Sequence, residues 1–191
     1  LPDADNVAIA VLPASFAGTL TSSYAHAHAG AIVINGGTLV VSADAYLGAI
    51  PSSAAINKIT LNGGTLQATE SFTLNANRGI TLGSSGGTFA VDASKSVSYA
   101  GVMAGTGGLT KSGSGSLTLT GANTFSGGTT LSGGQLIVGG ASTALGSGSV
   151  TVNSTRLSFD ITAGVSYANA FSVTGSGIFE NIGSNPITTT G

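Results

Sequence analysis

Two histidines are the residues of this chain whose type and spacing come nearest to a metal site. His26 and His28 stand two residues apart, so in a strand both imidazoles would lie on the same face. Neutral imidazole binds zinc, copper or nickel, but a zinc site normally uses three or four protein ligands, and no carboxylate is near in sequence. We interpret the pair chiefly as polar residues on a solvated strand face, and keep it only as a weak candidate for a metal site.

Acid–base catalysis on a polysaccharide would need carboxylates and basic residues that converge on one face. The pairs Glu70 with Asp92 and Asp160 with Glu180 are spaced so that they could stack in a repeating fold, but no Arg or Lys cluster accompanies either pair. The five basic residues are scattered singly, which leaves no patch for nucleic acid, and the absence of cysteine removes thiolate chemistry. The sequence therefore predicts no catalytic residue, no cofactor and no enzyme. It also predicts no binding of nucleic acid.

The elements available to position any site are short strands punctuated by glycine. Between Gly107 and Gly140, three alternating segments carry leucine and valine on one face and mostly Ser, Thr or Gln on the other. A similar phrase occurs as Ile34–Leu39, Leu61–Leu66 and Ser85–Phe89. Its apolar residue recurs about every 23 residues, a period typical of solenoid repeats and too short for a propeller blade.

The segment 107–157 resembles the autotransporter-associated β-strand repeat of bacterial passenger domains. The matching words are GGLTKSGSGSLTLTGANTFSGGTTLSGGQLIVGG and, further on, ALGSGSVTVN. The resemblance implies a right-handed β-helix that is exported to the cell exterior, often for adhesion or biofilm formation. It transfers no catalytic residue, because the repeat carries none.

We predict an all-β fold, a single-stranded right-handed parallel β-helix of about eight rungs. Residues 31–191 would form the solenoid, and residues 1–30 an N-terminal cap or an arm that pairs with another subunit through Val7, Ile9 and Val11. The expected core consists of inward-facing apolar residues: Leu39, Leu66, Leu74, Leu82, Phe89, Leu117, Leu119, Leu136, Val138, Val150, Val152, Leu157, Phe159, Phe171 and Phe179.

Three asparagines precede turns at equivalent places in their repeats. Asn tolerates left-handed backbone, and stacked amides can bond one another, so we expect Asn35, Asn62 and Asn153 to form a structural turn ladder.

The charge content limits the functional classes further. Only 6% of the residues are charged, against about 25% in ordinary domains, so a free monomer would have little protection against association. The longest apolar run near the N-terminus, Val7–Leu12, is too short to span a bilayer.

We therefore expect an extracellular or cell-surface rod, exported through the outer membrane. It would serve adhesion or build a self-assembled fibre or biofilm matrix through open strand edges, and would contact its own copies or a host or neighbouring cell. The alternative is a carbohydrate-binding module or a carbohydrate-active lyase or hydrolase on the same scaffold. Such a module would be expected to expose aromatic residues, which are only 6% of this chain.

Overall fold

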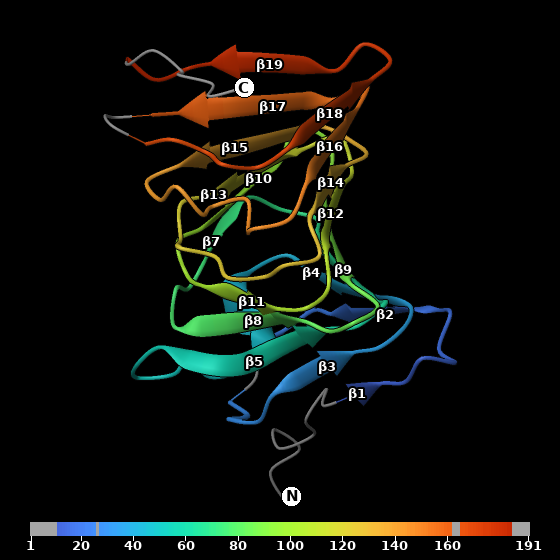
Figure 1. The fold of residues 1–191 in the computed structure, drawn as a ribbon. Helices are drawn as coiled ribbons and strands as arrows, with labels where there is room; N and C mark the ends of the chain where they lie inside the picture. Colours follow the sequence, from blue (N-terminus) through green and yellow to red (C-terminus); the bar gives the residue numbers. More distant parts are fainter. Residues whose placement is uncertain (1–10, 26, 162–164, 185–191) are drawn as a thin grey trace, which may run out of the picture.

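The computed structural model shows a parallel β-solenoid of about eight turns, as the repeats predict. It describes residues 11–25, 27–161 and 165–184. In this part of the chain every strand pair is parallel, and the successive turns stack from β1 at one end to β19 at the other (Figure 1).

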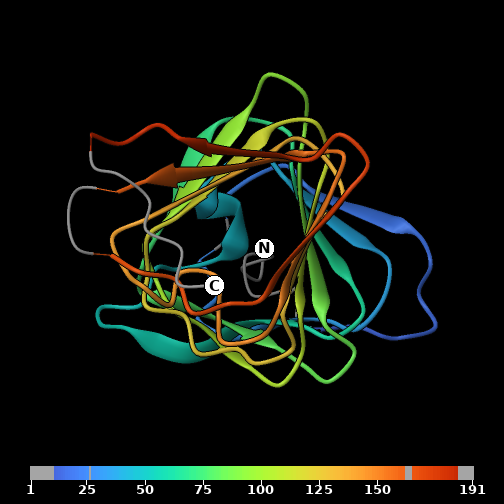
Figure 2. The same cartoon turned by 45° about the horizontal axis from the view of Figure 1, so that its top comes forward.

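Three sheets form the sides of the coil, and they surround a common core (Figure 2). The first sheet contains β1 (Val11–Leu12), β3 (Ile32–Ile34), β5 (Ala55–Leu61), β8 (Arg78–Leu82) and β11 (Met103–Gly105). The long sheet contains β2 (Thr19–Ser22), β4 (Thr38–Val41), β6 (Thr65–Ala68), β9 (Gly87–Val91), β12 (Leu109–Ser112), β14 (Thr129–Leu131), β16 (Val150–Asn153) and β18 (Phe171–Thr174). The third sheet contains β7 (Phe72–Leu74), β10 (Ser96–Tyr99), β13 (Ser116–Leu119), β15 (Gln135–Gly139), β17 (Arg156–Asp160) and β19 (Ile178–Asn181).

Within residues 11–25, 27–161 and 165–184, only the long sheet runs through all the turns. The first sheet serves the N-terminal turns and ends at β11, whereas the third sheet begins at β7. Where the third sheet has not yet begun, the short 3₁₀ helix η2 (Asp44–Leu47) occupies that side of the coil. The long sheet is therefore the continuous surface of the molecule.

The core is built from apolar residues that stack in register. Leu39, Leu66 and Phe89 lie on neighbouring strands of the long sheet and are fully buried. Thirteen of the fifteen predicted core residues are buried. Phe171 and Phe179 are the exceptions: Phe171 is partly buried and Phe179 is exposed, and both lie in the last turn that the structure describes.

A single period of about 23 residues would predict one column of apolar residues that runs through Leu39, Leu66, Phe89, Leu117, Leu136, Leu157 and Phe179, and this prediction is wrong because these residues lie in two different sheets. Leu39, Leu66 and Phe89 continue through Lys111 and Leu131 in the long sheet. Leu117 instead continues through Leu136, Leu157 and Phe179 in the third sheet. Similar glycine-containing segments precede strands of both sheets. Such a segment therefore indicates a corner of the coil but does not indicate which sheet the following strand joins.

A buried ion pair closes the side of the coil where the third sheet is missing. Arg78 is fully buried, and its Nε lies 2.8 Å from Oδ1 of Asp44. Its other nitrogens donate to Asp44 Oδ2 at 3.2 Å and to four carbonyl oxygens, those of Asp44, Leu47, Gly48 and Ala49. Every face of the guanidinium fork thus meets an acceptor, as burial of such a charge requires.

A buried amide continues the stacking where the first sheet ends. Asn123 accepts the backbone N–H of Met103 at 2.7 Å and donates to the carbonyl of Ala144 at 2.7 Å. Its side chain therefore joins the turn below to the turn above, beside the backbone hydrogen bonds from Thr124 to Met103 and from Ser126 to Gly105.

Candidate ligand-binding face

The outer face of the long sheet carries one hydroxyl on every turn. The residues in register are Thr19, Thr38, Thr65, Thr88, Thr110, Thr130, Thr151 and Ser172. We call this column the threonine ladder. Its first and last members are exposed and the others are partly exposed. Because neighbouring strands lie about 4.8 Å apart, the hydroxyls repeat at that interval along the axis.

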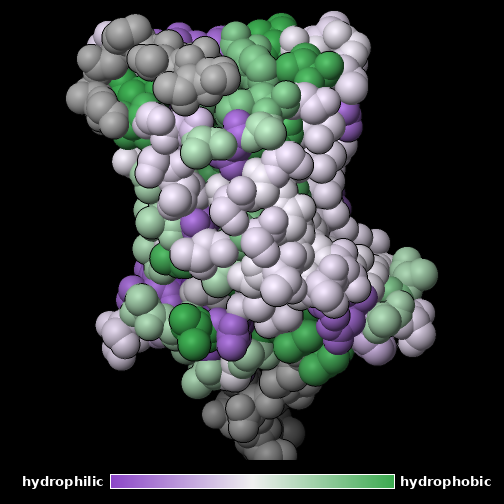
Figure 3. All heavy atoms as spheres, viewed as in Figure 1, coloured by the Kyte–Doolittle hydropathy of each residue, from purple (hydrophilic) through white to green (hydrophobic). Residues whose placement is uncertain are grey.

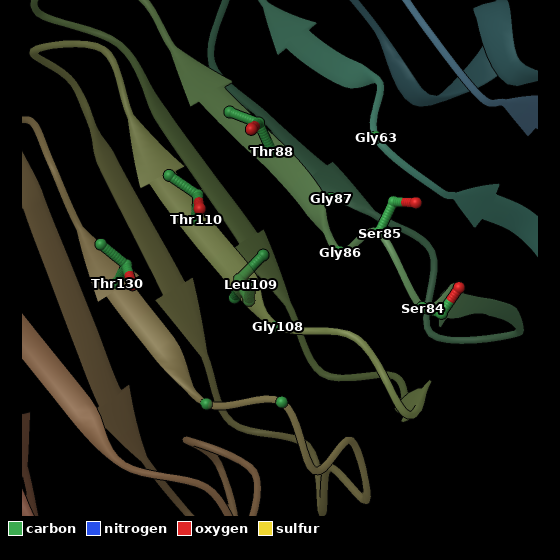
Figure 4. Close-up of a pocket in the computed structure, with 12 residues that line it drawn as sticks. Gly63, Ser84, Ser85, Gly86, Gly87, Thr88, Gly108, Leu109, Thr110 and Thr130 are labelled. Atoms are coloured by element: carbon green, nitrogen blue, oxygen red, sulfur yellow. The ribbon is translucent and has the colours of Figure 1, made fainter. Parts of the chain in front are cut away.

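A shallow hollow of about 250 Å³ lies beside the middle of the ladder. Figure 4 shows Thr88, Thr110 and Thr130 in a row on successive strands, with Gly86, Gly108 and the Ser84–Ser85 bend next to them. Asn62 fixes this bend, because its Oδ1 accepts the N–H of Ser85 at 3.0 Å.

Glycines line the floor of the hollow because the backbone there adopts conformations that disfavour other residues. Gly63, Gly86 and Gly128 have φ values of 99°, 70° and 86°, which side-chain-bearing residues rarely adopt. The chain turns a corner at these positions, and the same residues leave no side chain between the ladder and the solvent.

The chemistry of this face is neutral and polar. The twelve lining residues are glycines, serines, threonines and Leu109, so none is charged. A hydroxyl can both donate and accept a hydrogen bond. The face is therefore suited to an uncharged partner that offers hydroxyl or amide groups at a regular spacing.

A lysine is buried directly behind the ladder. Lys111 occupies a core position between Phe89 and Leu131 and is fully buried. Its Nζ donates to the carbonyls of Ser112 at 2.7 Å, Gly113 at 3.0 Å, Gly115 at 2.9 Å and Gly133 at 3.2 Å. Burial lowers the pKa of the Lys111 amine to about 8.

This lowered pKa predicts a pH dependence of stability. Between about pH 8 and pH 10 the folded amine loses its proton while the unfolded chain keeps it, so raising the pH favours the folded state. We expect the free energy of unfolding of the wild type, relative to Lys111→Met, to rise by about 1–2 kcal/mol from pH 7 to pH 9.5. Urea unfolding of both proteins at each pH measures it. A difference that stays flat or falls would contradict the prediction.

The candidate histidine site falls only in part on residues that the structure describes, and it stays a prediction. His28 is buried, and His26 lies outside the described residues. Among the residues that the structure describes, no group of three or more His, Cys, Asp or Glu could hold a metal ion.

The acidic pairs that could have stacked are out of register. Ala68 pairs with Val91, which places Asp92 beside Thr69 and not beside Glu70. Glu180 pairs with Ser158 and not with Asp160. Glu180 instead accepts hydrogen bonds from Ser158 at 2.6 Å and Arg156 at 2.9 Å, and these bonds hold the pKa of its carboxyl below the usual value.

The asparagines of the expected turn ladder lie at two different corners. Asn35 and Asn62 directly follow β3 and β5, which are neighbours in the first sheet. Asn153 ends β16 in the long sheet, where its neighbour in register is Thr174. The structure therefore brings the first two together and places the third elsewhere.

The N-terminal strand is described only in part. Val7 and Ile9 lie outside the described residues, whereas Val11 is exposed in β1, which pairs with β3. β2 begins the long sheet, so residues before 30 already contribute strands to the solenoid.

The threonine ladder was missed at the level of sequence, although a signal was present. The repeated phrase Gly-Gly-Thr places Thr38, Thr65 and Thr88 two residues after a corner glycine, and Thr110 has the same spacing from Gly108. Alignment of the repeats on the glycine two residues before each of these threonines would have placed the residues of the threonine ladder in one column.

These features define the class of protein, a β-solenoid built from stacked passenger-type turns. The family model of the passenger-associated-transport-repeat matches residues 17–41 and 109–138. The second match falls inside the predicted segment 107–157, and the first crosses residue 30, where a domain boundary was expected. The recognition of passenger-type repeats is confirmed.

One relative supports the same assignment. The chain is 41% identical over 111 residues to the adhesin BmaC autotransporter of Brucella suis biovar 1 (strain 1330). The alignment covers 54% of this chain and only 3% of that protein. No solved structure matches the chain. The chain therefore carries passenger-associated-transport repeats and is similar to a small part of an adhesin autotransporter.

The described residues contain no helix that is long and apolar enough to cross a membrane.

Proposed function

We propose that this chain is a non-enzymatic segment of a surface adhesion rod whose copies associate through the open strand edges at its ends. The observation that carries the proposal is the stacking itself. In the part of the chain that the structure describes, each turn pairs with the turn before it and the turn after it, so any strand edge left open in a copy would offer the same backbone groups that join every internal pair.

The C-terminal end of the described chain has the chemistry of a contact surface. Among the described residues, β18 and β19 are the last strands of their sheets, and Val173, Ile178 and Phe179 are exposed on them. Phe179 packs against Phe171 with ring centroids 5.5 Å apart, which supports a firm apolar platform.

The surface between the ends offers little electrostatic repulsion against association. Figure 3 shows one side of the solenoid, where residues of intermediate hydropathy dominate and hydrophilic residues are few. The formal net charge is −2 for 191 residues. Neighbouring copies would therefore repel each other weakly at physiological ionic strength.

Sedimentation velocity of the 191-residue chain across a range of concentrations tests the association. We expect concentration-dependent oligomers, and at least a tenfold weaker association after Val173→Lys together with Ile178→Lys, because charges on an edge block pairing.

The matched control introduces the same two charges on another face. Ile56→Lys with Val102→Lys changes an exposed residue of β5 and the exposed residue just before β11, both on the side of the first sheet, and should leave the association unchanged. A wild-type chain that stays monomeric at the highest concentration, or equal loss in both variants, would refute edge pairing. Adhesion of beads that carry each variant to cultured cells then tests the surface role separately.

A further inference from the structure

The cations of this chain that reach the surface lie beside the same hollow, although they are far apart in sequence. Three of the five basic residues are buried, namely Lys58, Arg78 and Lys111. The other two, Lys95 and Arg156, both line a hollow of about 460 Å³ at the corner between the long sheet and the third sheet. We call it the corner hollow. Ser96 and Arg156 are three strand steps apart in register, so the two cations are about 14 Å apart along the axis.

The wall of the corner hollow contains a third positive charge. The Nζ of Lys111 donates to four backbone carbonyl oxygens, and one of them, 2.9 Å away, belongs to Gly115, which lines the hollow. Among the described residues, all the hydrogen-bond acceptors of this ammonium are carbonyl groups and none is a carboxylate. A buried charge without a counter-ion therefore lies directly behind the hollow, where water and salt screen it weakly.

Two backbone N–H groups of the corner hollow are turned away from this ammonium. The carbonyl groups of Gly113 and Gly133 bind Lys111 Nζ at 3.0 Å and 3.2 Å. In a trans peptide the N–H points opposite to the C=O, so the N–H groups of the following residues, Ser114 and Gly134, point away from the buried charge. Both residues line the corner hollow. They are close neighbours, because a Cβ on Gly134 would lie 2.8 Å from the carbonyl carbon of Ser114.

These two N–H groups differ from the N–H groups of two other corners. Within residues 11–25, 27–161 and 165–184, no protein acceptor bonds either of them. Elsewhere a side chain accepts the corner N–H: Asn62 Oδ1 bonds Ser85 at 3.0 Å, and Ser71 Oγ bonds Ser96 at 3.0 Å. Backbone N–H groups that converge at a turn form an anion-binding concavity. The corner hollow thus offers N–H donors, a buried positive charge and two surface cations to one ligand.

The carboxylates near the corner hollow leave these donors free. Lys95 bonds Glu70 at 2.5 Å and Arg156 bonds Glu180 at 2.9 Å, and neither carboxylate lines the hollow. An ammonium has three donors and a guanidinium five, so each cation keeps donors beyond its ion pair. Asp92 of the preceding corner accepts a hydrogen bond from a glutamine side chain at 2.7 Å.

We propose that the corner hollow binds a sulfate or phosphate group. The N–H groups of Ser114 and Gly134 bond its oxygens, and the Ser116 hydroxyl is a further donor at the same place. Lys95 and Arg156 attract the anion from the two ends of the hollow, and Lys111 stabilises it from behind. The binding does not depend on the proposed association of copies.

Titration of the full 191-residue chain with sodium sulfate and with sodium phosphate, followed by NMR chemical-shift changes, tests the proposal. A sodium chloride series at the same ionic strength is the reference. We expect saturable shifts with both oxyanions that centre on Ser114 and Gly134, and a loss of about tenfold or more in affinity for K95Q/R156Q. Dextran sulfate and unmodified dextran in the same assay separate the two sources of the group. Tighter binding per sulfate on dextran sulfate identifies a polymer-borne ester as the source, and equal binding identifies the free ion.

The contribution of Lys111 has a separate readout. Burial lowers the pKa of its amine to about 8, whereas sulfate keeps its charge throughout this range. We therefore expect the wild type to bind sulfate about threefold or more weakly at pH 9.5 than at pH 7, and K111M to bind with little change between the two. The other charged groups around the corner are the same in both proteins, so their titration cancels: Glu70, Asp92, Lys95, Arg156 and Glu180.

Matched control variants change the net charge by one unit at different places. E70Q removes the carboxylate that competes for Lys95 and should tighten sulfate binding. D160N makes the same charge change at the opposite end of β17 from Arg156 and should bind as the wild type does. Equal shifts with sulfate and chloride, wild-type affinity in K95Q/R156Q, or equal effects of E70Q and D160N would overturn the proposal. The titration is done on the free chain, so its failure leaves the sedimentation result untouched, and the reverse also holds.

Discussion

Replacing Arg78 by leucine is expected to lower the free energy of unfolding by about 3–5 kcal/mol, a large fraction of the stability of a typical domain. The side chain is fully buried and bonds to Asp44 and to carbonyls of the η2 segment. Leucine can fill part of the volume but satisfies none of these acceptors, and Asp44 would keep a charge without its partner. Urea unfolding followed by circular dichroism measures the loss.

Arg156→Leu is the matched control for this prediction. Arg156 also pairs with a carboxylate, Glu180, at 2.9 Å, but its side chain is 47% exposed. Water can replace that partner, so we expect a change of no more than about 1 kcal/mol. Similar losses in both variants would show that Arg78 does not anchor the coil.

Gly105→Ala is expected to lower the free energy of unfolding by about 2–4 kcal/mol. Gly105 ends β11 with φ of 117°, a conformation that disfavours any side chain. A Cβ there would lie 2.1 Å from the carbonyl oxygen of Leu82 on the neighbouring turn. Since that oxygen belongs to the backbone, the two turns would have to separate. Thermal and urea unfolding of the purified variant measure the effect.

Gly30→Ala provides the comparison on the same chain. A Cβ at Gly30 would meet no atom within 4 Å, so the variant should match the wild type or be slightly more stable through its stiffer unfolded chain. If Gly105→Ala and Gly30→Ala have the same free energy of unfolding, the close approach of Gly105 to the neighbouring turn is contradicted.

The solenoid was predictable because its signal is local and repeated. Leu39, Leu66 and Phe89 share one phrase, and the structure stacks them in register. The sheet to which each phrase belongs was not predictable, because similar glycine corners precede both Thr38 and Gln135. A glycine corner determines the local backbone conformation. Which of the three sheets the next strand joins depends on the length and packing of the whole solenoid turn.

The polar core residues were not predictable for a different reason. Lys111 is separated by 22 residues from Gly133, one of its acceptors, and Arg78 by 34 residues from Asp44. The period of the apolar residues does not indicate that a lysine can occupy a core position that leucine fills in other turns. The cage of carbonyl oxygens that permits it exists only after the turns have stacked.

The candidate site was also only partly predictable from the sequence. The acidic pairs that attract attention in sequence, Glu70 with Asp92 and Asp160 with Glu180, are not brought into register by the structure. The threonines, which carry little chemistry singly, become a surface because every turn repeats them at the same place. In a solenoid the register gives weak groups a collective role.

The central claim is that turns stack in parallel register, and a paired-cysteine test addresses it directly. The chain has no cysteine, so two introduced thiols report only on each other. In the solenoid, Thr110 and Thr130 are direct neighbours on the long sheet, within the Cα separation that a disulfide accepts. In an antiparallel hairpin turning at Gly113–Gly115, Thr110 would instead face Thr118.

Oxidation of T110C/T130C and T110C/T118C at low concentration, read by intact mass, separates the two folds. The account predicts that T110C/T130C forms an intramolecular disulfide readily and that T110C/T118C remains reduced, because β12 and β13 belong to different sheets. A disulfide in T110C/T118C with T110C/T130C left reduced would contradict the stacked solenoid and, with it, the threonine ladder.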